Sequence, residues 1–106
     1  MSWPEDDDGD VMRRLEESGF DFSIEHDIDF NVDFFAWPPS QEAQDRLRSF
    51  GKLDLVGPND HGPGYVEIQV RAKLTYELVT SIQRRASNAM APYGGICESW
   101  GVFQPS

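Results

Sequence analysis

The residues of this sequence that could do chemistry gather between His26 and Asp33. His26 is followed by a row of acids at alternate positions, which are Asp27, Asp29 and Asp33. Imidazole and carboxylate groups can act as general acids and bases, or bind a divalent metal. Carboxylates in a row can equally bind the basic side chains of a partner protein. The pattern leaves two functions open: a small metal-dependent or acid-base enzyme that uses His26, Asp27 and Asp29, and a binding protein.

Apolar residues fill the positions between these acids. They are Ile28, Phe30, Val32 and Phe34. A period of two is typical of a half-buried β-strand, so we predict a strand over residues 26–36 with one face on a core and the acids on the other. The simpler alternative for His26 is a hydrogen bond that ties the entrance of this strand.

No catalytic motif supports the enzyme. The sequence has no Gly-x-Ser-x-Gly elbow, no His-Glu-x-x-His and no phosphate-binding Gly-x-x-x-x-Gly-Lys. The only cysteine, Cys97, has no histidine or cation beside it to lower its pKa, so we expect a small buried residue there. We therefore favour a binding protein that needs no metal and no other cofactor.

The excess negative charge of the chain lies in its first third. The formal net charge is -10, and residues 1–33 hold 12 acidic residues and two arginines. Such a field repels nucleic acid and anionic lipid and favours basic proteins. We expect a protein partner with a basic segment, and no direct contact with nucleic acid or membrane. The alternative is that the charge only keeps the protein soluble.

The length of 106 residues predicts one domain over residues 1–106, with residues 1–7 flexible. One cysteine allows no intrachain disulfide. The N-terminal residues do not have the pattern of a signal peptide, and no apolar run approaches the length of a membrane span. We therefore expect a cytoplasmic protein.

The remaining periodicities predict an α+β fold. The acids of residues 5–10 suit the start of a helix, with Asp8 or Asp10 as its cap. The elements after this helix are predicted as a strand at 26–36, a helix at 41–50 capped by Ser40, strands at 52–56 and 65–74, a helix at 76–90 and a strand at 96–103. This βαββαβ order is the ferredoxin-like arrangement, a four-stranded antiparallel sheet with helices on one face. Strands 26–36 and 65–74 should be neighbours at its centre.

The uncovered face of this sheet is the candidate binding surface. Adjacent central strands would bring Asp29 and Asp33 near Arg71 and Lys73. Glu98 is costly to bury, so we place it on the open face together with Trp100, two residues further along the last strand. The alternative is that Trp100 lies in the core or covers the sheet edge.

An apolar platform bordered by acids suits an arginine-rich segment, because guanidinium stacks on aromatic rings and pairs with carboxylates. Trp100 would be the anchor of this surface, and the acids at the N-terminus would steer the partner. The predicted protein-binding residues are Trp100, Tyr65, Asp27, Asp29, Asp33, Glu98, Asp6, Asp7 and Asp8.

Two segments carry a resemblance to a known family. An acidic helix and Gly19 lead into Phe22-Ser23-Ile24-Glu25-His26, and the chain closes with Glu98-Ser99-Trp100-Gly101 followed by Phe103. These segments and the order of elements resemble the regulator of ribonuclease E activity B (RraB) family, over about residues 8–103. The sequence departs from its best-known members, which have Asp-Gly in place of Glu98-Ser99 and a long acidic C-terminal tail.

The resemblance implies an acidic inhibitor and not an enzyme. Members of the family bind ribonuclease E, the endonuclease of the bacterial RNA degradosome, and dampen its action on transcripts. By resemblance, the partner of this chain is ribonuclease E or another degradosome component. An immunity-type inhibitor of some other protein is a third possibility that the residues alone leave open.

Overall fold

The structure is a computed structural model that describes residues 3–60, 62 and 64–102. Its elements in order are α1 (Asp7–Glu17), β1 (Glu25–Phe34), α2 (Gln41–Leu47), β2 (Lys52–Val56), β3 (Tyr65–Lys73), α3 (Tyr76–Met90), the 3-10 helix η1 (Ala91–Tyr93) and β4 (Gly95–Val102). In this described part of the chain, no helix has both the length and the apolar character needed to cross a membrane.

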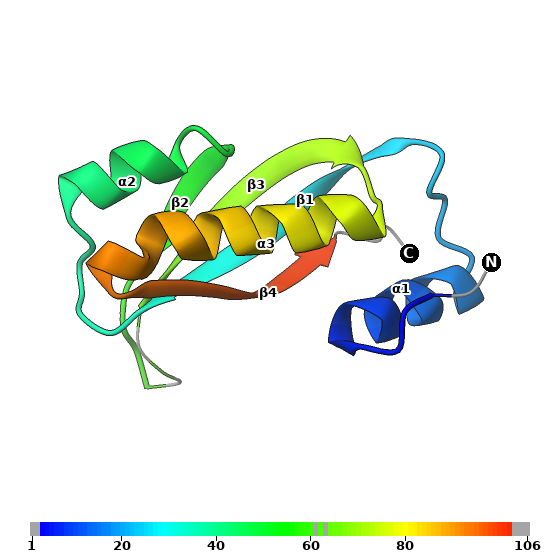
Figure 1. Cartoon of the computed structure of the whole chain (residues 1–106), viewed down its shortest axis with the longest axis horizontal. Helices are drawn as coiled ribbons and strands as arrows, with labels where there is room; N and C mark the ends of the chain where they lie inside the picture. The colour runs from blue at the N-terminus through cyan, green and yellow to red at the C-terminus, as the bar shows by residue number, and fades with distance from the viewer. Residues whose placement is uncertain (1–2, 61, 63, 103–106) are drawn as a thin grey trace.

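The four strands form one antiparallel sheet in the order β2-β3-β1-β4. Helix α3 runs across one face of this sheet, α2 lies beside it, and α1 lies beyond the end of β4, near the start of α3 (Figure 1). Over residues 3–60, 62 and 64–102, the other face carries no helix. This arrangement confirms the predicted α+β fold, with β1 and β3 as antiparallel neighbours at its centre.

The core lies between the sheet and the helices. Opposite one another on β1 and β3 stand Ile28 and Val70, Phe30 and Ile68, and Val32 and Val66. The helices add Ala43 and Leu47 from α2, and Val79, Ile82, Ala86 and Met90 from α3. Each fully buried large side chain of this set contributes roughly 1.5–3 kcal/mol to folding. The face of β1 that was predicted to be apolar is therefore the one that the helices cover.

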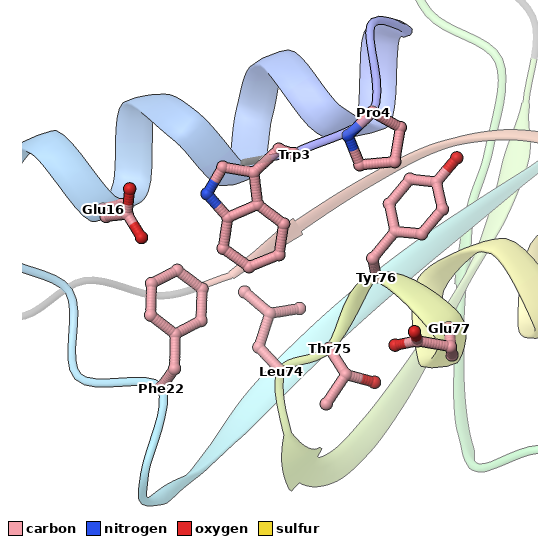
Figure 2. Close-up of a pocket in the computed structure, with 8 residues that line it drawn as sticks. All are labelled: Trp3, Pro4, Glu16, Phe22, Leu74, Thr75, Tyr76 and Glu77. Atoms are coloured by element: carbon pink, nitrogen blue, oxygen red, sulfur yellow. The ribbon is translucent and has the colours of Figure 1, made fainter. Parts of the chain in front are cut away.

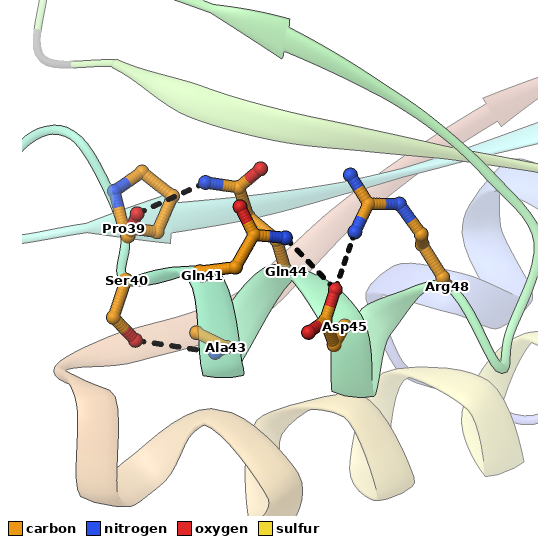
Figure 3. A network of polar contacts seen from close by, with 7 residues as sticks. All are labelled: Pro39, Ser40, Gln41, Ala43, Gln44, Asp45 and Arg48. Carbon is orange, nitrogen blue, oxygen red and sulfur yellow. Dashed lines mark hydrogen bonds and ion pairs between the residues drawn. The ribbon is translucent and has the colours of Figure 1, made fainter.

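Helix α2 begins as predicted and ends earlier. Ser40 is its N-cap and accepts a hydrogen bond from the amide of Ala43 at 3.1 Å. Figure 3 shows this bond and the two side chains, Gln41 and Arg48, that donate to Asp45 Oδ1 at 2.8 and 2.6 Å. The helix stops at Leu47 instead of residue 50.

Some predicted boundaries differ by one or two residues. Strand β1 ends at Phe34 instead of residue 36, ahead of Trp37-Pro38-Pro39, where two prolines lack the amide hydrogens of a ladder. Helix α1 is capped by Asp6, so the predicted caps Asp8 and Asp10 are wrong. Residue 103 of the predicted last strand lies outside the described residues, as do residues 1 and 2 of the segment predicted to be flexible.

A β-bulge in β4 decides which way Trp100 points. Ser99 lies opposite Asn31 and Cys97 lies opposite Val32, so Glu98 is one extra residue in the ladder. The bulge reverses the alternation, and Trp100 then lies opposite Phe30 on the helix-covered side. The predicted place of Trp100 on the open face is wrong, because that prediction assumed an unbroken alternation from Glu98 to Trp100.

Candidate protein-binding site

The open face of the sheet collects the polar residues of three strands. Strand β1 contributes Glu25, Asp27, Asp29, Asn31 and Asp33; β3 contributes Tyr65, Glu67, Gln69, Arg71 and Lys73; β2 contributes Lys52 and Asp54. Acids therefore outnumber cations on this face. Their distribution along the strands, set by the register, determines what the face can bind.

Charges are balanced only at one end of the face. There Arg71 forms an ion pair with Asp27 at 3.2 Å, and Lys73 lies opposite Glu25. The predicted approach of these cations to Asp29 and Asp33 is wrong, because the register places Gln69 and Tyr65 opposite those two acids. Among the described residues, no ion pair involves Asp29 or Asp33.

The centre of the face gathers acids that form no ion pair among the described residues, although Lys52 of β2 lies opposite Gln69 beside them. Glu67 lies between Asn31 on one neighbouring strand and Asp54 on the other. Burial, together with repulsion from Asp29 and Asp54, raises the pKa of Glu67. Burial also raises the pKa of Asp29, against a hydrogen bond from Gln69 that lowers it, and repulsion from Asp27 adds to the rise. The surroundings of Asp29 and Glu67 therefore disfavour the ionised form of each carboxyl group.

Two oxygen atoms at this centre lack hydrogen-bond donors. Asp29 Oδ1 and Asn31 Oδ1 are buried and have no hydrogen-bond partner among the described residues. Because such acceptors cost free energy until a donor reaches them, this part of the surface favours an incoming N–H group. In the described part of the chain, no group of three or more His, Cys, Asp or Glu residues is arranged to hold a metal ion.

Apolar residues surround Asp33 at the far end of the open face. Tyr65 and Ile96 lie opposite Asp33 on the two neighbouring strands. Phe35 follows β1, and its amide donates to the carbonyl of Gly94 at 3.1 Å, which extends the ladder by one residue. The side chains of Phe35 and Ile96 are 93% and 40% exposed.

Phe35 and Ile96 were missed at the sequence level as candidate site residues. The available signal was the alternation itself, which places Phe35 on the same side as the acids, where a polar residue would be expected. An aromatic ring at such a position, held by an ordered backbone, is typical of a contact surface.

Trp100 and two of the N-terminal acids join parts of the fold. The indole of Trp100 donates to Asp8 Oδ1 at 2.8 Å, and Gln83 donates to Asp8 Oδ2 at 3.0 Å. Asp8 thus links α1 to β4 and to α3. Asp6 accepts hydrogen bonds from the Tyr76 hydroxyl and from the amide of Gly9, and the bond from Tyr76 does most to lower the pKa of Asp6.

The other acids of the predicted site are exposed. Asp7 lies in the first turn of α1, and Glu98 is the extra residue of the bulge in β4. Because their side chains reach solvent, both add to the negative field outside the protein. Their role in partner binding stays a prediction.

The residues of the enzyme alternative do not converge. His26 Nε2 donates to the carbonyl of Asp21 at 2.7 Å, and its ring stacks on Phe20 with the centroids 4.3 Å apart. His26 lies on the covered side of β1, whereas Asp27 and Asp29 lie on the open side. The bond from His26 to Asp21 confirms the predicted hydrogen bond at the entrance of the strand.

Cys97 is buried, as predicted, at the start of the bulge. Burial, with smaller contributions from Asp33 and Asp8, raises the pKa of its thiol to about 12, so the thiol stays protonated at neutral pH. The hydroxyl of Ser87 accepts from the backbone amide of Cys97 at 2.9 Å and donates to its carbonyl at 3.2 Å. Cys97 thus helps to attach β4 to α3.

Comparison with known proteins gives one match. The profile of a family described as "Regulator of ribonuclease activity B" matches residues 5–102. This range includes every helix and strand from α1 to β4. No curated protein and no solved structure matches the chain.

Proposed function

Since the chain belongs to the RraB family of regulators of ribonuclease activity, we propose that it restrains a ribonuclease by binding a basic segment of that enzyme on the open face of its sheet. By resemblance the partner is ribonuclease E or a component of its degradosome scaffold, in the cytoplasm of a bacterium. The observation that carries this proposal is the set of three acids at the centre of the open face, Asp29, Asp54 and Glu67, that form no ion pair among the described residues.

The centre of the face suits arginine and lysine side chains. Burial, with added repulsion from Asp29 and Asp54, raises the pKa of Glu67, and burial, with added repulsion from Asp27, raises that of Asp29. A cation placed among them replaces repulsion with attraction, and a guanidinium can also donate to the unpaired oxygens. Part of the desolvation that usually opposes ion pairing has already taken place in the folded protein.

The apolar end of the face supplies an anchor. Phe35, Ile96 and Tyr65 surround Asp33 and offer aromatic and aliphatic surface beside a carboxylate. Interfaces draw most of their binding energy from a few such residues. The expected partner segment therefore carries basic residues next to at least one apolar side chain, and Phe35 takes the anchoring role that the sequence alone suggested for Trp100.

The acids at the N-terminus act at longer range. Asp7 is exposed at the start of α1, and together with Asp6 and Asp8 it adds to the negative field of the whole protein. Fields of this kind raise the association rate of a basic partner and are screened by salt. Glu98, exposed in β4, adds to the same field.

Calorimetric titration of purified ribonuclease E with the chain, paired with an RNA cleavage assay, tests the proposal. The triple variant Asp29→Asn/Asp54→Asn/Glu67→Gln should lose at least about ten-fold in affinity at low salt, and inhibition should fall with it. A matched control, Glu17→Gln/Glu42→Gln/Asp45→Asn, removes the same charge from exposed positions on helices α1 and α2 and should stay within about two-fold.

Two results would contradict the proposal. Equal losses in the two triple variants would mean that only net charge matters. Absence of binding and of inhibition by the unmodified chain, with both the catalytic and the scaffold part of the enzyme, would exclude ribonuclease E as the partner.

A further inference from the structure

A second concave site lies away from the open face. It is a cavity of about 440 Å³ where the N-terminal segment and α1 meet the start of α3 (Figure 2). Its lining residues are Trp3, Pro4, Glu16, Phe22, Leu74, Thr75, Tyr76 and Glu77. Leu74 belongs to the hydrophobic core, so the cavity opens on the helix-covered side of the sheet. Its volume is within the range of ligand pockets, roughly 300–1,000 Å³.

The lining of this cavity is chemically one-sided. It presents three aromatic rings, from Trp3, Phe22 and Tyr76, and two carboxylates, from Glu16 and Glu77. The faces of aromatic rings carry partial negative charge, and none of the described residues that line the cavity is a lysine or an arginine. Rings and carboxylates together favour a cation that has an apolar stem.

The aromatic walls are held in place by their neighbours. The ring of Trp3 packs against Phe22 with the centroids 5.6 Å apart, and Phe22 meets the edge of Phe20 at 4.9 Å. The hydroxyl of Tyr76 donates to Asp6, which fixes the opposite wall. A cavity with such fixed walls loses little conformational freedom when a ligand enters.

The position of Trp3 also has a cost that packing alone does not explain. Its indole Nε1 is buried and has no hydrogen-bond acceptor in the part of the chain that the structure describes, although a buried indole N–H usually finds one. A residue that only closed the core would be expected to satisfy this donor. Because a guanidinium has only donors, this N–H is left for a carbonyl of the bound segment's main chain.

We propose that this cavity binds the side chain of an arginine from a protein partner, with the guanidinium near the aromatic rings and the two carboxylates and the methylene stem against Leu74. Arginine fits better than a compact inorganic cation because it is weakly hydrated, stacks on aromatic rings and pairs with carboxylates. The proposal relies on the proposed function only for the identity of the partner, to which the cavity would add a second contact.

Nuclear magnetic resonance titration with N-acetyl-arginine amide tests the cavity without any ribonuclease. The arginine probe should shift the indole resonance of Trp3 and the amides of Leu74 and Tyr76, saturably and with a Kd on the order of millimolar. N-acetyl-citrulline amide, a neutral analogue of similar shape, should bind at least about five-fold more weakly.

Variants of the lining residues test whether the arginine probe binds in the cavity. Glu16→Gln/Glu77→Gln should weaken the arginine probe about five-fold or more, because both carboxylates are lost. Glu17→Gln/Glu42→Gln, a matched pair of exposed positions outside the cavity, should not. Trp3→Leu keeps an apolar wall, removes the ring, and should weaken the arginine probe more than the citrulline probe.

Three results would overturn the inference: equal binding of the arginine and citrulline probes, shifts confined to the open face, or no shift at 50-fold the concentration expected for half-saturation. The titration contains no ribonuclease, so such a result would leave the proposed function standing. Conversely, if the chain does not bind ribonuclease E, the titration with the arginine probe still decides whether the cavity binds arginine.

Discussion

Two groups of acids in this protein have opposite surroundings. Asp6 and Asp8, at the start of α1, accept hydrogen bonds from Tyr76, Gln83 and Trp100. Asp29 and Glu67, at the centre of the open face, lie near other acids. The first pair holds helices and sheet together, whereas the second is left unneutralised on the surface.

The pKa values of Asp6 and Glu67, one acid from each group, are shifted in opposite directions. Hydrogen bonding, chiefly from Tyr76, lowers the pKa of Asp6, so its ionised form stabilises the fold. Burial and repulsion raise the pKa of Glu67, so its ionised form costs stability. Acids whose ionised form costs stability in the free protein are candidates for a binding role.

The largest expected effect is a loss of stability when Trp100, on the covered side, is removed, compared with the removal of Phe35 from the open face. Trp100→Ala should lower the free energy of unfolding by about 2–4 kcal/mol, because it leaves a cavity beside Phe30 and removes the donor to Asp8. Phe35→Ala, at an exposed ring, should change it by less than about 0.5 kcal/mol. Urea denaturation measures both. A stable Trp100→Ala variant that fails to bind the partner would show that Trp100 is a binding residue and not a structural one.

The second effect is the difference in stability between variants of Asp8 and of its neighbour Asp7. Asp8→Asn should cost about 1–2 kcal/mol, since an amide cannot accept from both Trp100 and Gln83 as the carboxylate does. Asp7→Asn removes the same charge from the same helix turn and should cost less, about 0.5 kcal/mol, through the helix dipole alone. Thermal and urea unfolding of the two variants give the difference, and equal losses would show that the Asp8 contacts contribute nothing.

The third effect is a pH dependence of opposite sign in the two groups. The pKa of Glu67 is raised, so Glu67→Gln should stabilise the protein at pH 7 by about 0.5 kcal/mol. This gain should disappear as the pH falls through the raised pKa and below the ordinary value of 4.5, where Glu67 is itself neutral. Denaturation at a series of pH values measures it; a loss of stability at pH 7 would contradict the repulsion.

Asp6→Asn should show the reverse pattern. The lowered pKa means that the ionised form contributes stability above the ordinary value of 3.8, and that this contribution is lost as the pH falls through the lowered pKa. The variant should therefore be less stable than the unmodified chain at pH 7 and equal to it in strong acid. The same denaturation series measures this difference, and a difference that does not depend on pH would mean that the charge of Asp6 is not responsible.

The smallest effect concerns the ion pair on the open face. Arg71→Gln should change stability by less than about 0.5 kcal/mol, because both partners in the pair are largely exposed. It should nevertheless speed association with the basic partner at low salt, since it removes a positive charge from the face. Stopped-flow mixing at two salt concentrations checks this, and slower association would mean that Arg71 itself contacts the partner.

Much of the fold could be predicted because its signals are local. The alternation from Ile28 to Phe34 predicted β1, Ser40 predicted the start of α2, and the apolar stripe of α3 predicted its bounds, residues 76–90. The resemblance to the RraB family, now confirmed, rested on short segments of the same local kind. The cap of α1 was missed because several acids compete for that position, and only the packing of α1 against Tyr76 selects Asp6.

The site was predicted less well because it depends on contacts between distant residues. The sequence determined that Asp27, Asp29 and Asp33 share one face of β1, since alternation is a property of one strand. Only the tertiary structure decided that Arg71 pairs with Asp27, because that depends on the register between β1 and β3. Likewise, the one-residue bulge at Glu98 turns Trp100 to the covered side, and its effect appears only when β4 is paired with β1.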